Sequence, residues 1–181
     1  MTDPSAAPLG TAGLVTLLTD RLLAGPSATA VLEEWCHERG LSAGGSRLCA
    51  VPVTAAARAP SAQQCERLGV GSPDLVRYRR VRLTCGAHVL SEAQNWYVPE
   101  RLTPGMNRVL DTTATPFGRA VHALAPQRRN LSLERLWTQT AGRPGPATAL
   151  FAIHAVLSTA DGVPFCEVVE TYRGAILADG G

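Results

Sequence analysis

The chain has 181 residues and a formal net charge of +2, and 45% of its residues are hydrophobic. That length suits one domain with its own core, and so small a net charge does not point to nucleic acid or an acidic membrane surface as partner. No run of 18 or more apolar residues occurs, so we expect no membrane span. The N-terminus shows no signal-peptide pattern, which makes a cytoplasmic location the default expectation.

The residue inventory excludes two kinds of chemistry. All 17 residues counted as lysine or arginine are arginine, so neither a lysine Schiff base nor a Walker A phosphate loop can form. The five cysteines show no CxxC spacing, and the four histidines are far apart in the sequence. These patterns predict reduced, mostly buried thiols and no metal or organic cofactor.

Spacing and turn signals define the elements in chain order. An Ala/Pro/Ser-rich stretch over 1–11 predicts a disordered tail. Apolar spacing and capping residues predict five helices, over 13–23, 28–39, 61–69, 103–110 and 115–124. Alternating apolar residues predict six strands, over 47–54, 75–84, 89–98, 130–137, 148–158 and 164–173. Most strands follow one another across short turns, so we expect a single α+β domain over 12–181 with an antiparallel sheet.

The second predicted strand is rich in arginine. Alternation places Arg79 on the same face as Val81 and Leu83, and Arg80 on the opposite face. The two aliphatic residues mark the buried face, so Arg79 needs an anionic partner from the protein or from a ligand. The alternative is a twisted strand whose arginines are all hydrated.

The last predicted strand carries a comparable carboxyl group. Alternation places Glu170 among apolar neighbours and Glu167 on the other face. An enclosed carboxyl group needs either a proton or a nearby cation, and the alternative to a functional role is a structural Glu170–Arg79 salt bridge. His154 points away from the apolar face of its own strand, which predicts a surface or inter-strand residue rather than a catalytic base.

Two predicted helix starts offer free backbone N–H groups, which favour negative charge. One is Ser27-Ala28-Thr29, and the other is Thr115-Pro116-Phe117-Gly118. Ordinary helix capping is the alternative explanation for each of them.

Four motifs occur in a characteristic order, namely Leu22–Thr29, Tyr78–Val81, Thr115–Arg119 and Val168–Tyr172. Their order and spacing resemble the chorismate pyruvate-lyase family, which makes 4-hydroxybenzoate. Ligand-sensing domains of some GntR-type transcription regulators share that fold. The resemblance covers about residues 12–175, and it implies a six-stranded antiparallel sheet whose helices and flaps close over an internal pocket.

The resemblance also implies roles for individual residues. Arg79 would pair with the ring carboxylate of the ligand, and Glu170 would contact the oxygen at the opposite end of the ring. The backbone N–H groups of Ala28 and Phe117 would complete the polar contacts. The family usually has leucine where this chain has Phe117, so we expect a narrower or reshaped pocket. A register shift of one residue would substitute Arg80 for Arg79, or Glu167 for Glu170.

The resulting hypothesis is a chorismate lyase that releases pyruvate and uses no cofactor. Arg79 would hold the ring carboxylate, and a protonated or proton-sharing Glu170 would stabilise the departing oxygen. The alternatives are a non-catalytic sensor of aromatic acids, a related enzyme of secondary metabolism with another small substrate, and a scaffold with a structural ion pair. In each functional case the expected partner is a small aromatic carboxylate, and a compact domain of this type can be monomeric.

Overall fold

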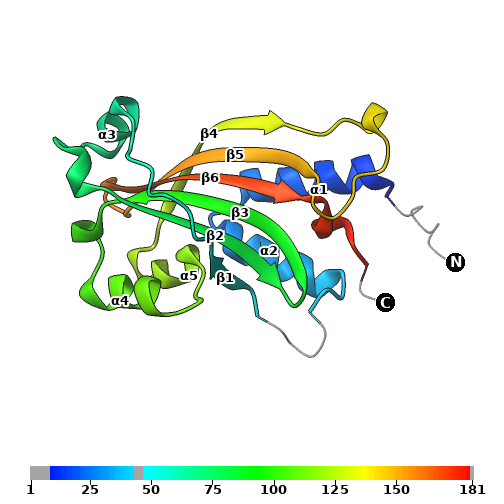
Figure 1. The fold of residues 1–181 in the computed structure, drawn as a ribbon, viewed down its shortest axis with the longest axis horizontal. Coiled ribbons are helices and arrows are strands. Elements are labelled where there is room, and N and C mark those ends of the chain that lie inside the picture. Colours follow the sequence, from blue (N-terminus) through cyan, green and yellow to red (C-terminus); the bar gives the residue numbers. More distant parts are fainter. Residues whose placement is uncertain (1–8, 43–46, 180–181) are drawn as a thin grey trace, which may run out of the picture.

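The computed structural model describes residues 9–42 and 47–179. Six strands form one antiparallel sheet in the order β1-β2-β3-β6-β5-β4 (Figure 1). Their bounds are β1 Cys49–Pro52, β2 Arg77–Cys85, β3 His88–Tyr97, β4 Gln127–Arg135, β5 Ala149–Ser158 and β6 Pro164–Arg173. The predicted α+β class and the six-stranded antiparallel sheet are confirmed. Two neighbouring pairs, β2–β3 and β5–β6, are hairpins, as the short turns between them predicted.

The helices are α1 Thr11–Ala24, α2 Ala28–Glu38, α3 Ala62–Leu68, α4 Pro104–Thr112 and α5 Phe117–Ala120. Local signals set their ends: the Ser27 side chain accepts a hydrogen bond from the Ala30 N–H, and Ser61 and Gln64 form a capping box. The helix predicted over 115–124 is shorter, because α5 ends at Ala120 and a 3₁₀ turn follows. Most of the tail predicted over 1–11 lies outside the described residues, and its end is corrected because α1 begins at Thr11.

The helices cover the two faces of the sheet unequally. Helices α1 and α2 lie across one face (Figure 1), and the start of α2 meets α5 there. Helix α3 sits at one end of the sheet, where its Arg67 contacts the opposite face. Within the part of the chain that the structure describes, no helix is both long and apolar enough to cross a bilayer.

Strand register decides which side chains face α2 and α5. Val81 pairs with Ala93, and Ala93 pairs in turn with Glu170, so these three residues lie in one row across β2, β3 and β6. In the next row Arg79 pairs with Asn95, and Asn95 pairs with Val168. Because Val81 and Leu83 are buried on this side, the predicted orientation of the arginine strand is confirmed.

Candidate functional site

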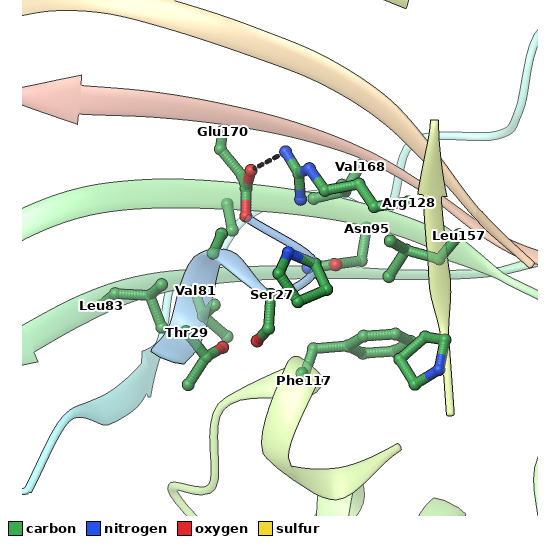
Figure 2. A pocket seen from close by; sticks show the side chains of 15 residues that line it. Ser27, Thr29, Val81, Leu83, Asn95, Phe117, Arg128, Leu157, Val168 and Glu170 are labelled. Carbon is green, nitrogen blue, oxygen red and sulfur yellow. Dashed lines mark hydrogen bonds and ion pairs between the residues drawn. The ribbon is translucent and has the colours of Figure 1, made fainter. Parts of the chain in front are cut away.

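A small cavity lies between the sheet and the starts of α2 and α5. Fifteen residues line it, from both helix starts and from strands β2 to β6 (Figure 2). It leaves about 40 Å³ for the centres of water molecules, which is room for about three or four waters. A benzoate derivative has about ten non-hydrogen atoms, so a ligand of that size must displace the water and widen the cavity.

The two helix starts close the cavity by direct contact. A Cβ atom placed on Gly118 of α5 would lie 2.7 Å from Thr29 Oγ1 and 3.3 Å from Ser27 Oγ. Only glycine allows the two segments to approach so closely. Behind this contact, Arg119 of α5 forms an ion pair with Glu33 of α2. These segments are the flaps that the family resemblance implied.

Three residues form a polar cluster at one side of the cavity. Arg128 Nη2 donates to Glu170 Oε2 over 2.6 Å, and the Tyr172 hydroxyl donates to the same oxygen over 3.2 Å. The Arg128 side chain is 4% exposed and that of Glu170 is 8% exposed. Burial works to lower the pKa of Arg128, but the Glu170 carboxylate outweighs it, so this pKa lies above its ordinary value. Figure 2 shows the ion pair on the cavity wall.

Two neighbouring side chains on the same face each have one donor atom without an acceptor among the described residues. Asn95 lines the cavity and is 2% exposed, and its Nδ2 atom is buried without a hydrogen-bond partner among the described residues. Arg79, its cross-strand neighbour, donates from Nη2 to the Thr115 carbonyl over 3.3 Å, but its buried Nη1 atom also lacks a partner there. Burial lowers the pKa of the Arg79 guanidinium, and more distant anionic groups offset it only in part.

The residues predicted for the site are brought together with one difference. Ala28, Phe117 and Glu170 all line the cavity, while Arg79 lies beside the lining, next to Asn95. The Phe117 side chain is buried, and its ring centroid lies 5.4 Å from that of Tyr97. Strand alternation therefore placed Arg79 and Glu170 on the correct face of the sheet.

One interpretation of the ionic contacts needs correction. The structural salt bridge considered between Glu170 and Arg79 does not form, because the partner of Glu170 is Arg128. The sequence reasoning missed Arg128, which lies ahead of the strand expected to begin at residue 130. The proton-sharing role expected of Glu170 stays a prediction; in the structure its Oε2 atom accepts hydrogen bonds from Arg128 and Tyr172.

The residues offered by a register shift lie on the opposite face of the sheet. Glu167 is fully buried there and accepts hydrogen bonds from Arg67 Nε at 2.7 Å and Nη2 at 2.8 Å. His154 Nε2 lies 2.6 Å from the same carboxylate, so this histidine is an inter-strand residue, as expected. Arg80 bonds to Glu92 on that side. Neither Arg80 nor Glu167 therefore belongs to the cavity.

Sequence comparison finds one informative relative. The chain is 40% identical over 174 residues to the uncharacterized protein y4mC of Sinorhizobium fredii (strain NBRC 101917 / NGR234). The match covers 88% of this chain and 73% of that protein. A search against protein family models gives no match.

Structural comparison finds a shared fold at low sequence identity. PhnF from Mycobacterium smegmatis is similar with a TM-score of 0.57 and 15% identity, over 84% of this chain and 65% of that chain. The effector domain of the same protein gives a TM-score of 0.56 and 15% identity, over 82% of this chain and 89% of the domain. This likeness establishes the fold alone, which is that of the PhnF effector domain.

Proposed function

The chain belongs to the same family as the uncharacterized protein y4mC, and we propose that it binds a small organic carboxylate in the cavity on the helix-covered face of its sheet. The observation that carries the proposal is that Arg79 Nη1 and Asn95 Nδ2 are buried and have no acceptor within the described part of the chain. A buried donor without an acceptor costs about 1–3 kcal/mol, and more when it is charged. A ligand carboxylate would supply the acceptor that both groups lack, and two oxygens suit two donors on adjacent strands.

The local charge also suits an anion. Glu170 and Arg128 neutralise each other, whereas Arg79 has no salt-bridge partner among the described residues. A ligand with one negative charge would make the enclosed site electrically neutral, which favours its transfer from water. The start of α2, an 11-residue helix, adds backbone N–H dipoles at the opposite wall.

Binding without turnover fits these contacts better than catalysis does. Glu170 is held by Arg128 and Tyr172 as a hydrogen-bond acceptor, whereas a general acid must hold a proton to give away. The fold is that of a regulator's effector domain. Both points favour a sensor or carrier of a small carboxylate.

A calorimetric titration with benzoate and 4-hydroxybenzoate tests the proposal. Wild-type protein should bind at least one of them, and Arg79→Met should weaken that binding tenfold or more, since an oriented charge-assisted contact is worth about 1.5–3 kcal/mol. Arg80→Met on the opposite face is the matched control and should bind as wild type does. Absence of binding to both ligands, or equal binding by the Arg79 variant, would contradict the proposal.

Chorismate lyase activity is the second candidate, because Ala28, Phe117 and Glu170 occupy the positions that the family resemblance assigns to substrate contacts. In that reaction Arg79 would hold the ring carboxylate while the enolpyruvyl ether breaks, and Arg128 beside Glu170 would stabilise negative charge on the departing oxygen. Incubation with chorismate would then release pyruvate, measured with lactate dehydrogenase, in step with 4-hydroxybenzoate. If chorismate binds but no pyruvate is released, the lyase reaction is contradicted and only the binding function remains.

A further inference from the structure

The two edges of the sheet differ in how they are protected. At one edge β1 has four residues and contains Pro52, and its Ala50 N–H donates to the Ala114 carbonyl over 2.7 Å. At the other edge β4 has nine residues and no proline. Within the described part of the chain, the backbone hydrogen bonds of β4 all go to β5, and Figure 1 shows β4 along the upper margin of the sheet. Its outer row of N–H and C=O groups is therefore open to pairing with another strand.

Two charged side chains project from β4 on the face of the sheet away from the cavity. Arg129 pairs with Val156 of β5, and Glu134 pairs with Ala152 of the same strand. Both β5 residues lie on the face that carries Glu167. The side chains of Arg129 and Glu134 are exposed, and neither forms an ion pair with a described residue. The free edge thus carries one positive and one negative charge whose partners are still to be found.

A β-bulge brings these two charges to one face. In a regular strand, residues an odd number of positions apart point to opposite sides of the sheet. The register shift between Asn130 and Ser132 adds one residue to β4, so Glu134 returns to the side of Arg129. On that face the exposed edge is positive toward its start and negative toward its end.

Such an edge is complementary to itself. When two β4 strands pair antiparallel about a two-fold axis between Leu131 and Ser132, Arg129 of each copy lies directly opposite Glu134 of the other. Opposite charges at directly opposed positions stabilise an antiparallel pair. A two-fold contact repeats every interaction, so this register forms the Arg129–Glu134 pair twice.

The flanking residues are compatible with the same register. Arg135 of one copy lies opposite Arg128 of the other, but Arg128 is buried against Glu170, which balances its charge. Leu136, directly after β4, is 44% exposed, and the start of the second strand at Gln127 would cover it. Pairing therefore removes apolar surface from water as well as joining the two backbones.

We propose that the chain forms a two-fold symmetric homodimer in which the β4 strands of two copies pair antiparallel and join their sheets into one. The inference goes beyond ligand binding and does not depend on it. A second copy fits this edge because the self-paired register gives each exposed charge its opposite. Pairing would also hold β4 from both sides, and β4 is the strand that carries Arg128 into the cavity.

Sedimentation velocity over a range of protein concentrations tests the dimer. Wild-type protein should approach twice the 19.1 kDa mass of one chain as its concentration rises. Glu134→Arg sets an arginine against Arg129 at both ends of the paired strands, so the dissociation constant of the dimer should rise about tenfold or more. Arg129→Glu should weaken the dimer similarly, by opposing two glutamates. The double variant Arg129→Glu/Glu134→Arg restores opposite charges and should return to within about threefold of wild type.

Glu34→Arg is the matched control, since Glu34 is exposed on α2, and it should dimerise as wild type does. Amide hydrogen exchange gives a second measurement, because residues 127–135 should exchange more slowly in the wild-type dimer than in Glu134→Arg. Wild-type protein that stays monomeric at every concentration would overturn the proposal. A Glu134→Arg dimer as tight as wild type, or a double variant that does not recover, would overturn it as well, because the two charges would then not face each other.

Discussion

Strand β6 carries two buried glutamates that face opposite sides of the sheet, and their surroundings differ in what is left unpaired. Glu167 has three hydrogen bonds spread over both oxygens, from Arg67 and His154. Glu170 has two on one oxygen, from Arg128 and Tyr172. The first network is closed, whereas the second leaves an acceptor at the wall of a cavity.

The cations differ as well. Arg67 and His154 are 22% and 27% exposed, so water reaches both partners of Glu167. The Arg128 side chain is 4% exposed, and Glu170 is its one salt-bridge partner among the described residues. The closed network fastens α3 to the sheet, which is a structural task. The Glu170 network places a buried ion pair beside donors that lack acceptors, an arrangement typical of ligand-binding sites.

The largest expected loss of stability comes from removing the carboxylate of Glu170, the acidic member of the open network. Glu170→Gln leaves Arg128 buried and charged, because arginine does not lose its proton in proteins, and removing one partner of a buried pair costs about 3–5 kcal/mol. Urea unfolding should show this loss. Arg128→Met should also destabilise the protein, because it removes the other partner of the same buried pair.

Glu167→Gln is the matching change on the closed side. We expect the free energy of unfolding to fall by about 1–2 kcal/mol, because water can hydrate the partly exposed Arg67 and His154 that the change leaves without a carboxylate. If Glu167→Gln destabilises the protein more than Glu170→Gln does, the distinction between the two networks is wrong.

A smaller loss is expected where the flaps meet. Gly118→Ala places a Cβ atom 2.7 Å from Thr29 Oγ1, so either α5 shifts or the threonine changes rotamer. We expect this adjustment to lower the free energy of unfolding by about 1–2 kcal/mol. The thermal midpoint should fall accordingly. Thr29→Ala in the same chain removes the clashing oxygen and should restore most of the loss. A Gly118 variant as stable as wild type would show that the flaps are not in firm contact.

Arg79→Met should affect stability in the opposite direction to Arg128→Met. Arg79 is partly buried and has no salt bridge among the described residues, and an apolar side chain removes that unpaired charge. We expect the ligand-free protein to be unchanged or more stable by about 1 kcal/mol, as is common where a site is kept for binding. Urea unfolding without ligand measures it. A loss of more than about 2 kcal/mol would identify Arg79 as a structural residue.

Much of the fold could be predicted from local signals. Ser27 after Gly25-Pro26, and the capping box beginning at Ser61, set helix starts that the structure confirms. Period-two alternation gave the faces of Arg79 and Glu170 correctly because β2 and β6 run without a bulge through those residues.

Arg128 could not be found in this way, for a physical reason. Leu131 and Leu133 suggest that odd-numbered residues of β4 face the core, which would turn Arg128 outward. A register shift between Asn130 and Ser132 reverses that alternation, so Arg128 and Asn130 pair with Leu157 and Ala155 on the core side. Alternation also gives the face of a side chain but not its reach, so it could not choose between Arg79 and Arg128 as the partner of Glu170.

The smallest effect expected is the pH dependence of the closed network. Burial works to raise the pKa of Glu167, but its hydrogen bonds to Arg67 and His154 outweigh this, so its pKa is lower in the folded chain than in the unfolded one. A depressed carboxyl pKa adds stability above the unfolded value, and that stability disappears as the pH falls through the folded value.

The contribution of Glu167 should therefore be complete at pH 6 and should decline once the pH falls below about 4.5. Glu167→Gln has no such carboxylate, so the difference in unfolding free energy between wild type and this variant should shrink as the solution is acidified through that range. Urea unfolding at a series of pH values measures the difference. A gap that stays constant from pH 6 to the acid limit would mean that the carboxylate is not the group responsible. A gap that widens on acidification would mean that its folded pKa is raised, and that the network is held together by a shared proton rather than by charge.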